Sequence, residues 1–285
     1  MSALDDLLPL LRCPHCSAGL GRVGEAVRCE AGHSFDVARQ GYLSLLGREG
    51  TAHTGDTAEM VAARERFLGG GHFDRLAAEL GEAVAGGAAP GSEPGCLLDL
   101  GAGTGWYLSR VLDRVPAARG LAFDVSKPAL RRAARAHPRL AAVAADTWSP
   151  LPLGDAVAAA VIDVFAPRNA PEIARVLRDD GVAAFVTPAP GHLQELVTAL
   201  GLLTVDEHKH ERLAEQLAPH LEIVATEDLE WRLRLDRAAA RDAAGMGPTA
   251  FHVDAPELAE RVAELPQPVD VTAAVTLTLA TPASG

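Results

Sequence analysis

The sequence has few aromatic residues, more acidic than basic charge and no long apolar run. Aromatic residues make up 4% of its 285 positions, which argues against an aromatic-rich surface that stacks many bases. The 38 acidic and 26 basic residues give a formal net charge of −12. That charge argues against a simple non-specific polyanion binder and leaves only a local basic patch for contact with a polyanion.

The chain also lacks signals for a membrane or for export. No apolar run approaches the roughly 18 to 20 residues that a membrane span needs. The N-terminus carries Asp5 and Asp6 and no basic region ahead of its short apolar stretch, so it does not resemble a secretory signal. We therefore expect a cytoplasmic protein with no membrane partner.

Cysteine is scarce, and three of the four cysteines lie close to the N-terminus. Cys13, Cys16, Cys29 and His33 form a C-x2-C-x12-C-x3-H pattern, in which two ligand pairs on tight turns can surround a metal. Three thiolates and one imidazole favour zinc, and four protein ligands close the site, so we predict one structural Zn²⁺. His15 is an alternative fourth ligand, but it lies inside the first cysteine pair and would crowd that turn.

The pattern of the chain predicts three units, at residues 1–36, 37–92 and 93–285. The first has too few apolar residues for a core of its own and depends on its metal. The second is a helical connector with helices at 57–68 and 73–85. In the third, short apolar strands alternate with helices, which predicts a parallel sheet with helices on both faces. The expected strands are 96–100, 120–124, 141–145, 157–165, 182–187, 229–235 and 271–279, and the expected helices are 106–115, 128–137, 171–177, 192–200, 236–244 and 257–265.

A glycine-rich turn follows the first strand of this large unit, where the sequence reads LLDLGAGTG from Leu97 to Gly105. Glycines let the backbone approach a ligand closely, although such a loop would also suit a dinucleotide. Asp99, Asp124 and Asp146 lie at or after the ends of three strands. Three carboxylates suit the sulfonium and amino groups of S-adenosylmethionine better than a pyrophosphate. Asp124 and Asp146 can also be read as ordinary turn or cap residues.

Leu98–Gly105 resembles motif I of the class I S-adenosylmethionine-dependent methyltransferases. The zinc pattern and several further segments resemble one family, the large-subunit rRNA guanine-N1 methyltransferases. Its actinomycete branch, which confers resistance to tylosin- and mycinamicin-type macrolides, is the most similar. The resemblance extends from Leu11 to about Leu279. Its further segments are His33–Leu46, Gly55–Arg64, Gly71–Phe73, Leu121–Lys127, Val164–Arg168 and Thr187–His192.

This resemblance implies a Rossmann-like class I methyltransferase domain at 93–285, with a seven-stranded sheet and a small N-terminal zinc-binding domain. It implies that 1–36 recognises RNA, that 37–92 contributes to the donor pocket, and that a homodimer grips a 23S rRNA hairpin. Without it, Phe73 would be assigned to the core and His192 to the cap of helix 192–200. The implied donor-binding residues are Phe73, Asp99, Gly101, Ala102, Gly103, Gly105, Asp124, Asp146 and His192.

Methylation of guanine N1 requires loss of a proton, which a base or a group that stabilises charge on O6 would assist. Asp163, Arg168 and Asn169 lie at the end of the fourth strand, which faces the methyl group in this fold class. Asp163 could accept the proton, Arg168 could stabilise O6 and Asn169 could orient the base. A strand-end carboxylate and solvated loop residues explain them equally well, so no catalytic residue is assigned.

A base inside a hairpin must be unstacked before it reaches the methyl group. Trp106, Tyr107, Trp148 and Phe165 are candidate stacking partners, although core packing is the preferred interpretation of each. The sharpest basic run, which a solvated helix face would also explain, is Lys127, Arg131, Arg132, Arg135 and Arg139, with Arg131 and Arg135 on one helix face.

Two other functions are compatible with the sequence. A small-molecule methyltransferase, such as one acting on a natural product, would use the same fold. A non-catalytic RNA-binding or assembly factor would keep a vestigial donor pocket, but the intact glycine loop and acidic residues argue against it.

Overall fold

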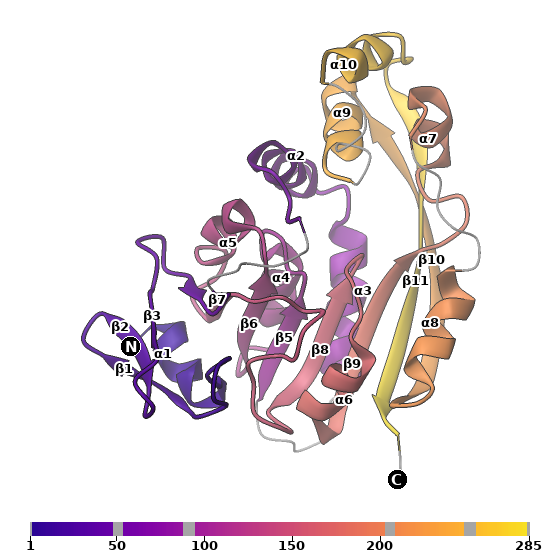
Figure 1. Ribbon diagram of the computed structural model, residues 1–285. Coiled ribbons are helices and arrows are strands. Elements are labelled where there is room, and N and C mark those ends of the chain that lie inside the picture. The colour runs from indigo at the N-terminus through magenta and orange to yellow at the C-terminus, as the bar shows by residue number, and fades with distance from the viewer. Residues whose placement is uncertain (1, 48–53, 88–94, 203–208, 248–254, 284–285) are drawn as a thin grey trace.

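The computed structural model describes residues 2–47, 54–87, 95–202, 209–247 and 255–283 (Figure 1). The N-terminal module lies at one edge of a central sheet, and a long hairpin of the C-terminal third rises at the opposite edge. Within the described residues, no helix has the length and apolarity to cross a bilayer.

The central sheet has eight strands in the order β10-β11-β9-β8-β5-β6-β7-β4. Neighbouring strands from β9 to β4 are parallel, whereas β11 is antiparallel to both β9 and β10. The strands are β4 (Leu43–Ser44), β5 (Cys96–Leu100), β6 (Arg119–Asp124), β7 (Leu140–Ala144), β8 (Ala158–Val164), β9 (Leu177–Pro188), β10 (Leu221–Leu235) and β11 (Val269–Pro282).

Helices cover both faces of this sheet, as the alternation of strands and helices predicts. Leu97 packs with the α3, α4 and α5 side chains on one face, while its neighbour Leu98 packs with those of α1, α6 and α8 on the other. Successive side chains of a strand point to opposite faces, so a strand buried on both is a continuous apolar run. These helices are α1 (Ala3–Leu7), α3 (Asp74–Gly87), α4 (Trp106–Arg114), α5 (Lys127–Ala133), α6 (Ala170–Val176) and α8 (Lys209–Leu217).

The seven strands expected from the sequence are all present, and β4 is an eighth. Leu43 and Ser44 of the expected connector pair with Val143 and Ala144 of β7, which extends the sheet at its edge. The strand has two residues, too short for hydrophobic periodicity to reveal. It attaches the N-terminal part of the chain directly to the sheet.

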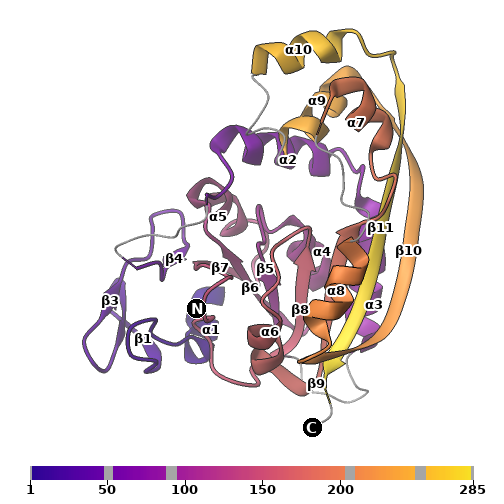
Figure 2. The same ribbon diagram turned by 45° about the vertical axis from the view of Figure 1, so that its right-hand side comes forward.

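The C-terminal third forms the expected strand pair, with longer strands than predicted. β10 and β11 are antiparallel throughout and extend beyond the rest of the sheet (Figure 2). Near the far end of this hairpin lie α7 (Gln194–Leu200), α9 (Arg237–Gly245) and α10 (Ala255–Ala263), and α2 (Ala58–Gly69) packs against α9. Together α2 and α9 form a roof over the carboxyl ends of the parallel strands.

The N-terminal module has a three-stranded antiparallel sheet of β1 (Leu20–Val23), β2 (Ala26–Cys29) and β3 (Ser34–Phe35). The sequence predicts that this module lacks a core of its own, and the structure shows that it shares the core of the central sheet. Leu4, Leu7 and Leu11 are buried in one cluster with Phe123 and Val143 of the central sheet. The module therefore uses the core of the large domain as well as its metal.

Candidate active site and zinc centre

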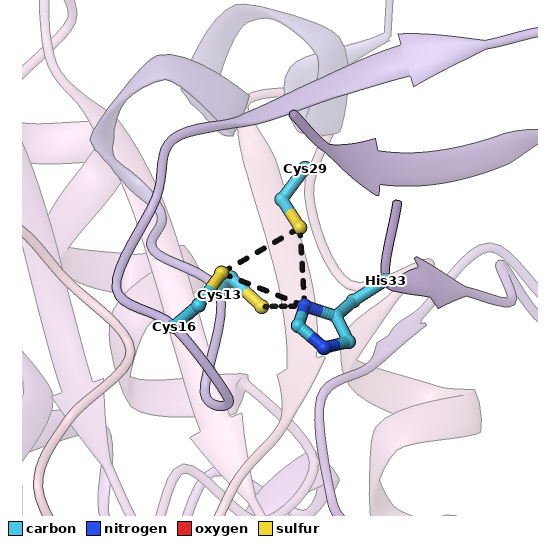
Figure 3. Close-up of side chains that lie close together, drawn as sticks. All are labelled: Cys13, Cys16, Cys29 and His33. Atoms are coloured by element: carbon cyan, nitrogen blue, oxygen red, sulfur yellow. Dashed lines mark hydrogen bonds between the residues drawn. The ribbon is translucent and has the colours of Figure 1, made fainter. Parts of the chain in front are cut away.

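The four predicted zinc ligands converge in the N-terminal module (Figure 3). His33 Nδ1 lies 3.5 Å from Cys13 Sγ, 3.5 Å from Cys16 Sγ and 3.3 Å from Cys29 Sγ, and Cys16 Sγ lies 3.7 Å from Cys29 Sγ. A tetrahedral Zn²⁺ with ordinary bond lengths requires S···S edges of about 3.8 Å and S···N edges of about 3.5 Å. The four ligand atoms therefore fit one zinc ion.

Two tight turns produce this geometry. After the first pair, Ser17 adopts a left-handed backbone and its N–H donates to the Cys13 carbonyl; after Cys29, Gly32 does the same toward the Cys29 carbonyl. The ring of His15 packs beside that of His33, with centroids 5.0 Å apart, and His15 does not belong to the ligand cluster. The choice of His33 over His15 is supported by this arrangement.

The glycine loop joins the end of β5 to α4 and lines a cavity of about 950 Å³. Gly101, Gly103 and Gly105 all have positive φ angles, between 55° and 73°. A Cβ on Gly101 would lie 2.6 Å from the Ala166 Cβ, and one on Gly103 would lie 3.2 Å from Arg64 Nη1. Glycine is favoured at both positions because L side chains rarely adopt this backbone conformation, and at Gly101 a Cβ would also clash with Ala166.

The acidic residues occupy different positions around this loop. Asp124 and Asp146 line the cavity, as do Ala102 and Gly103. Asp124 accepts hydrogen bonds from the N–H groups of Gly103, at 2.8 Å, and Ser126, at 2.7 Å, so it fixes the loop against the end of β6. Burial raises the pKa of Asp124, and these two hydrogen bonds oppose the rise.

Asp99 lies beneath the loop and is not among the described residues that line the cavity. Its side chain is buried, and its Oδ2 has no hydrogen-bond partner within the part of the chain that the structure describes. Burial, together with the nearby charge of Asp124, raises the pKa of Asp99 to about 8. In the donor-free protein, Asp99 therefore contributes less negative charge at neutral pH than the sequence suggested.

The roof of the cavity comes from residues whose role the sequence reasoning missed. Arg64 of α2 forms an ion pair with Asp56 and donates to the Met246 carbonyl at 2.8 Å. All three residues line the cavity. The segment Gly55–Arg64 carries part of the family resemblance, but its spacing does not reveal that Arg64 reaches the glycine loop.

Phe73 and His192 lie side by side in the cavity wall, with ring centroids 6.1 Å apart. Phe73 is almost fully buried and also packs edge-to-face against Trp231, at 5.4 Å. His192 Nδ1 lies 2.7 Å from the Ala274 carbonyl oxygen, which holds the ring against β11. His192 does not cap the following helix, because α7 begins at Gln194 with Leu193 at its N-cap position.

Trp148 and Phe165 are exposed aromatic residues of the cavity wall, at 52% and 39% exposure. Core packing, the preferred interpretation of both, is therefore wrong. Phe165 has a φ of 56° and its centroid lies 5.7 Å from that of His192. A left-handed backbone at a bulky residue costs free energy and is typical of functional sites. Trp106 and Tyr107 also line the cavity, and their rings pack edge-to-face on each other.

The three catalytic candidates differ in their access to the cavity. Asp163 is fully buried and lies 3.9 Å from the Arg168 guanidinium. Arg168 lines the cavity, whereas Asp163 and Asn169 are not among the described lining residues. The Asn169 amide donates to the carbonyls of Thr147, Trp148 and Ser149, and so holds the loop that carries Trp148.

The expected basic helix face is not formed. α5 ends at Ala133, so Arg135 lies beyond it and cannot share a helix face with Arg131. Arg139 donates to three carbonyls at the end of α4, and Arg132 pairs with Glu65 at 2.9 Å. Lys127, Arg131 and Arg135 remain exposed.

These features define a class I S-adenosylmethionine-dependent methyltransferase with an N-terminal zinc ribbon. The family model described as RlmA, N-terminal, a zinc ribbon, matches residues 11–47, and one described as a methyltransferase domain matches residues 97–181. A putative methyltransferase structure solved in complex with the Haloferax volcanii Trm112 activator shares the fold, with a TM-score of 0.50 and 20% identity over 81% of this chain and 100% of that one.

Curated relatives narrow the assignment. The chain is 52% identical to the 23S rRNA (guanine(748)-N(1))-methyltransferase of Streptomyces fradiae, over 95% of this chain and 96% of the relative. It is also 52% identical to a putative 23S rRNA (guanine-N(1)-)-methyltransferase of Micromonospora griseorubida, over 95% and 97%. The protein belongs to the family of 23S rRNA guanine-N1 methyltransferases.

Proposed function

We propose that this chain methylates N1 of a guanine in a 23S rRNA hairpin loop and that the modification confers resistance to macrolide antibiotics. The observation that carries the proposal is the 52% identity to the two rRNA methyltransferases, which extends over 95% of the chain and so includes the zinc ribbon, the roof and the methyltransferase domain. A small-molecule enzyme that shared only the fold would not be expected to match through all three.

The donor site is formed by the glycine loop and the residues that face it. We assign the donor contacts to Phe73, Asp124, Asp146 and His192, together with the backbone of residues 101–104, all around one cavity. Gly105 is not among the described lining residues and shapes the turn into α4. Asp99 acts from beneath the loop. When bound, S-adenosylmethionine supplies a methyl group activated by its sulfonium. The carboxylates match its positive charge, and the left-handed glycines leave the backbone open to close approach.

Trp148 and Phe165 form the proposed contact with the target base. Both are exposed at the cavity wall, from the loops that follow β7 and β8. A guanine that leaves its stack loses base-stacking energy, and an aromatic face can replace about 1–3 kcal/mol of it per base. This replacement would hold the flipped base beside the donor.

Arg168 is the group we propose to assist removal of the N1 proton. Its guanidinium can stabilise the negative charge that develops on O6 as the N1 proton passes to solvent water. Asp163 is fully buried beside it and positions the guanidinium. Asp163 is therefore a positioning residue in this proposal and not a general base.

The zinc module, residues 1–36, would recognise the rRNA in a cytoplasmic homodimer, with 37–92 as the connector and 93–285 as the methyltransferase domain. The module has no uniformly basic surface, because Arg22 pairs with Asp5 at 2.8 Å. Arg28 of the module and Arg39 of the connector are exposed. Arg48 lies outside the described residues. Recognition would then depend on shape and a few arginines, and the acidic remainder would limit non-specific RNA binding.

A transfer assay from tritiated donor tests the proposal against its two alternatives. Protein-free 23S rRNA should accept label, whereas 16S rRNA and a panel of small natural-product acceptors should not. Label in small molecules alone would favour the small-molecule enzyme. Donor binding with no transfer to naked rRNA or to ribosomal subunits would contradict methylation, and absence of donor binding would favour the non-catalytic factor.

A further inference from the structure

Arg64 is the strongest feature that the proposed function leaves without a role. It lies on α2, in the roof, and its side chain is 26% exposed. Among the described residues that line the cavity, Arg64 and Arg168 are the only lysine or arginine side chains. The donor carries one anionic group, its α-carboxylate, which needs a cationic or hydrogen-bonding partner inside the cavity.

The two arginines lie over different parts of the glycine loop. Arg64 Nη1 is 3.2 Å from the position that a Cβ on Gly103 would take. Arg168 follows Ala166, which lies over Gly101, and its guanidinium is directed to the buried Asp163. Gly103 is closer than Gly101 in sequence to α4, which begins at Trp106. The N-terminus of a helix favours negative charge.

The contacts of Arg64 hold its guanidinium in place without using all of its donors. Nη1 pairs with Asp56, and Nη2 donates to the Met246 carbonyl at 2.8 Å. The guanidinium carries five N–H donors, so these two contacts leave capacity for a carboxylate. Arg64 and Asp124 line the same cavity. Burial raises the pKa of Asp124, and the charge of Arg64 opposes that rise.

We infer that Arg64 binds the α-carboxylate of S-adenosylmethionine and, through Asp56 and Met246, holds the roof over the bound donor. Asp56 is joined to the loop that follows β6, because Ser126 Oγ donates to its carbonyl at 2.7 Å and Ser126 N–H donates to Asp124 at 2.7 Å. Arg64 therefore links the roof, the glycine loop and the donor. This inference rests on the donor assigned under the proposed function.

The test compares S-adenosylmethionine with its decarboxylated analogue, which differs only by the carboxylate, in calorimetric titrations of the full chain. Arg64→Gln should weaken binding of S-adenosylmethionine about 10- to 100-fold, the range expected for a lost charged hydrogen bond. Binding of the decarboxylated analogue should change less than about threefold, which would also show that the variant is folded. Arg64→Lys should lose less affinity than Arg64→Gln.

Arg66→Gln is the matched control. Arg66 lies on the same helix, holds α9 through Asp242 at 2.9 and 2.6 Å, and is not among the described lining residues. If loosening of the roof were the cause, Arg66→Gln and Arg64→Gln would weaken both ligands alike, and the inference would be overturned. A carboxylate-specific loss in Arg168→Gln instead would also overturn it. No donor binding by the unaltered chain would refute the proposed function itself, whereas binding without discrimination by Arg64→Gln would refute only this inference.

Discussion

At the scale of single residues, burial gives three carboxylates of one site different properties. Asp124 and Asp146 face the cavity, whereas Asp99 lies below the loop with an unsatisfied oxygen and a pKa raised to about 8. An unfolded aspartate ionises near pH 4, so ionisation favours the unfolded chain over a wide pH range. Ionisation of Asp99 therefore lowers the free energy of unfolding, and it places a negative charge beneath the glycine loop.

Asp99→Asn should remove this dependence on pH. For the donor-free wild type, the contribution of Asp99 to the free energy of unfolding is fully present below about pH 4 and is lost as the pH rises to about 8. The variant cannot ionise, so the difference in unfolding free energy between variant and wild type should increase in favour of the variant across that window and then level off. Urea denaturation at a series of pH values measures it.

Asp179→Asn, at an exposed position, is the control. Its free energy of unfolding should vary with pH in parallel with that of the wild type. Parallel curves for Asp99→Asn and the wild type between pH 4 and 8 would show that Asp99 ionises normally in the folded protein.

At the scale of elements, the N-terminal module is attached to the large domain by more than its metal. Its leucines share a core with the central sheet, and β4 pairs with β7 just before the loop that carries Asp146. The zinc ion holds together the two turns that carry its ligands. The apolar contacts hold the N-terminal module against the large domain. Loss of zinc should therefore loosen one part of the molecule without unfolding the rest.

Removal of zinc by a chelator, or Cys16→Ser, should release the amide protons of β1, β2 and β3 to fast hydrogen exchange. The free energy of unfolding of the central sheet should fall much less, because its core is formed by other elements. Donor affinity should change less than about threefold, since no described residue of the zinc cluster lines the cavity. Loss of protection throughout β5 to β9 would show instead that the metal supports the whole fold.

Much of the fold follows from local patterns in the sequence, and the exceptions have tertiary causes. The strand and loop at Leu97–Gly105 and the four zinc ligands were predicted because each is encoded within a short segment. The two-residue strand β4 was missed because it is too short to show a periodicity. Helix α8 was also missed, although its apolar residues Leu213 and Leu217 recur at helical spacing. The exposure of Trp148 and the contact of Arg64 with the glycine loop depend on residues far apart in the chain.

At the scale of the whole molecule, the cavity lies between the connector and the large domain. The glycine loop supplies the floor, α2 and α9 supply the roof, and the loops after β7 and β8 supply the exposed aromatic residues. The same chain carries a zinc ribbon at one edge of the sheet and a net charge of −12. Under the proposed function, this combination would limit non-specific binding of RNA and favour recognition of one RNA structure by its shape.

The most direct test of the central claim is the chemical identity of the methylated nucleoside. Protein-free 23S rRNA from an unmodified strain would be incubated with enzyme and donor, digested to nucleosides and analysed by mass spectrometry against authentic methylguanosines. In parallel, primer extension would map the position, because an N1 methyl group blocks Watson–Crick pairing. The account predicts 1-methylguanosine and one new stop in a hairpin loop. A different methylated nucleoside, or 1-methylguanosine spread over many sites, would contradict it.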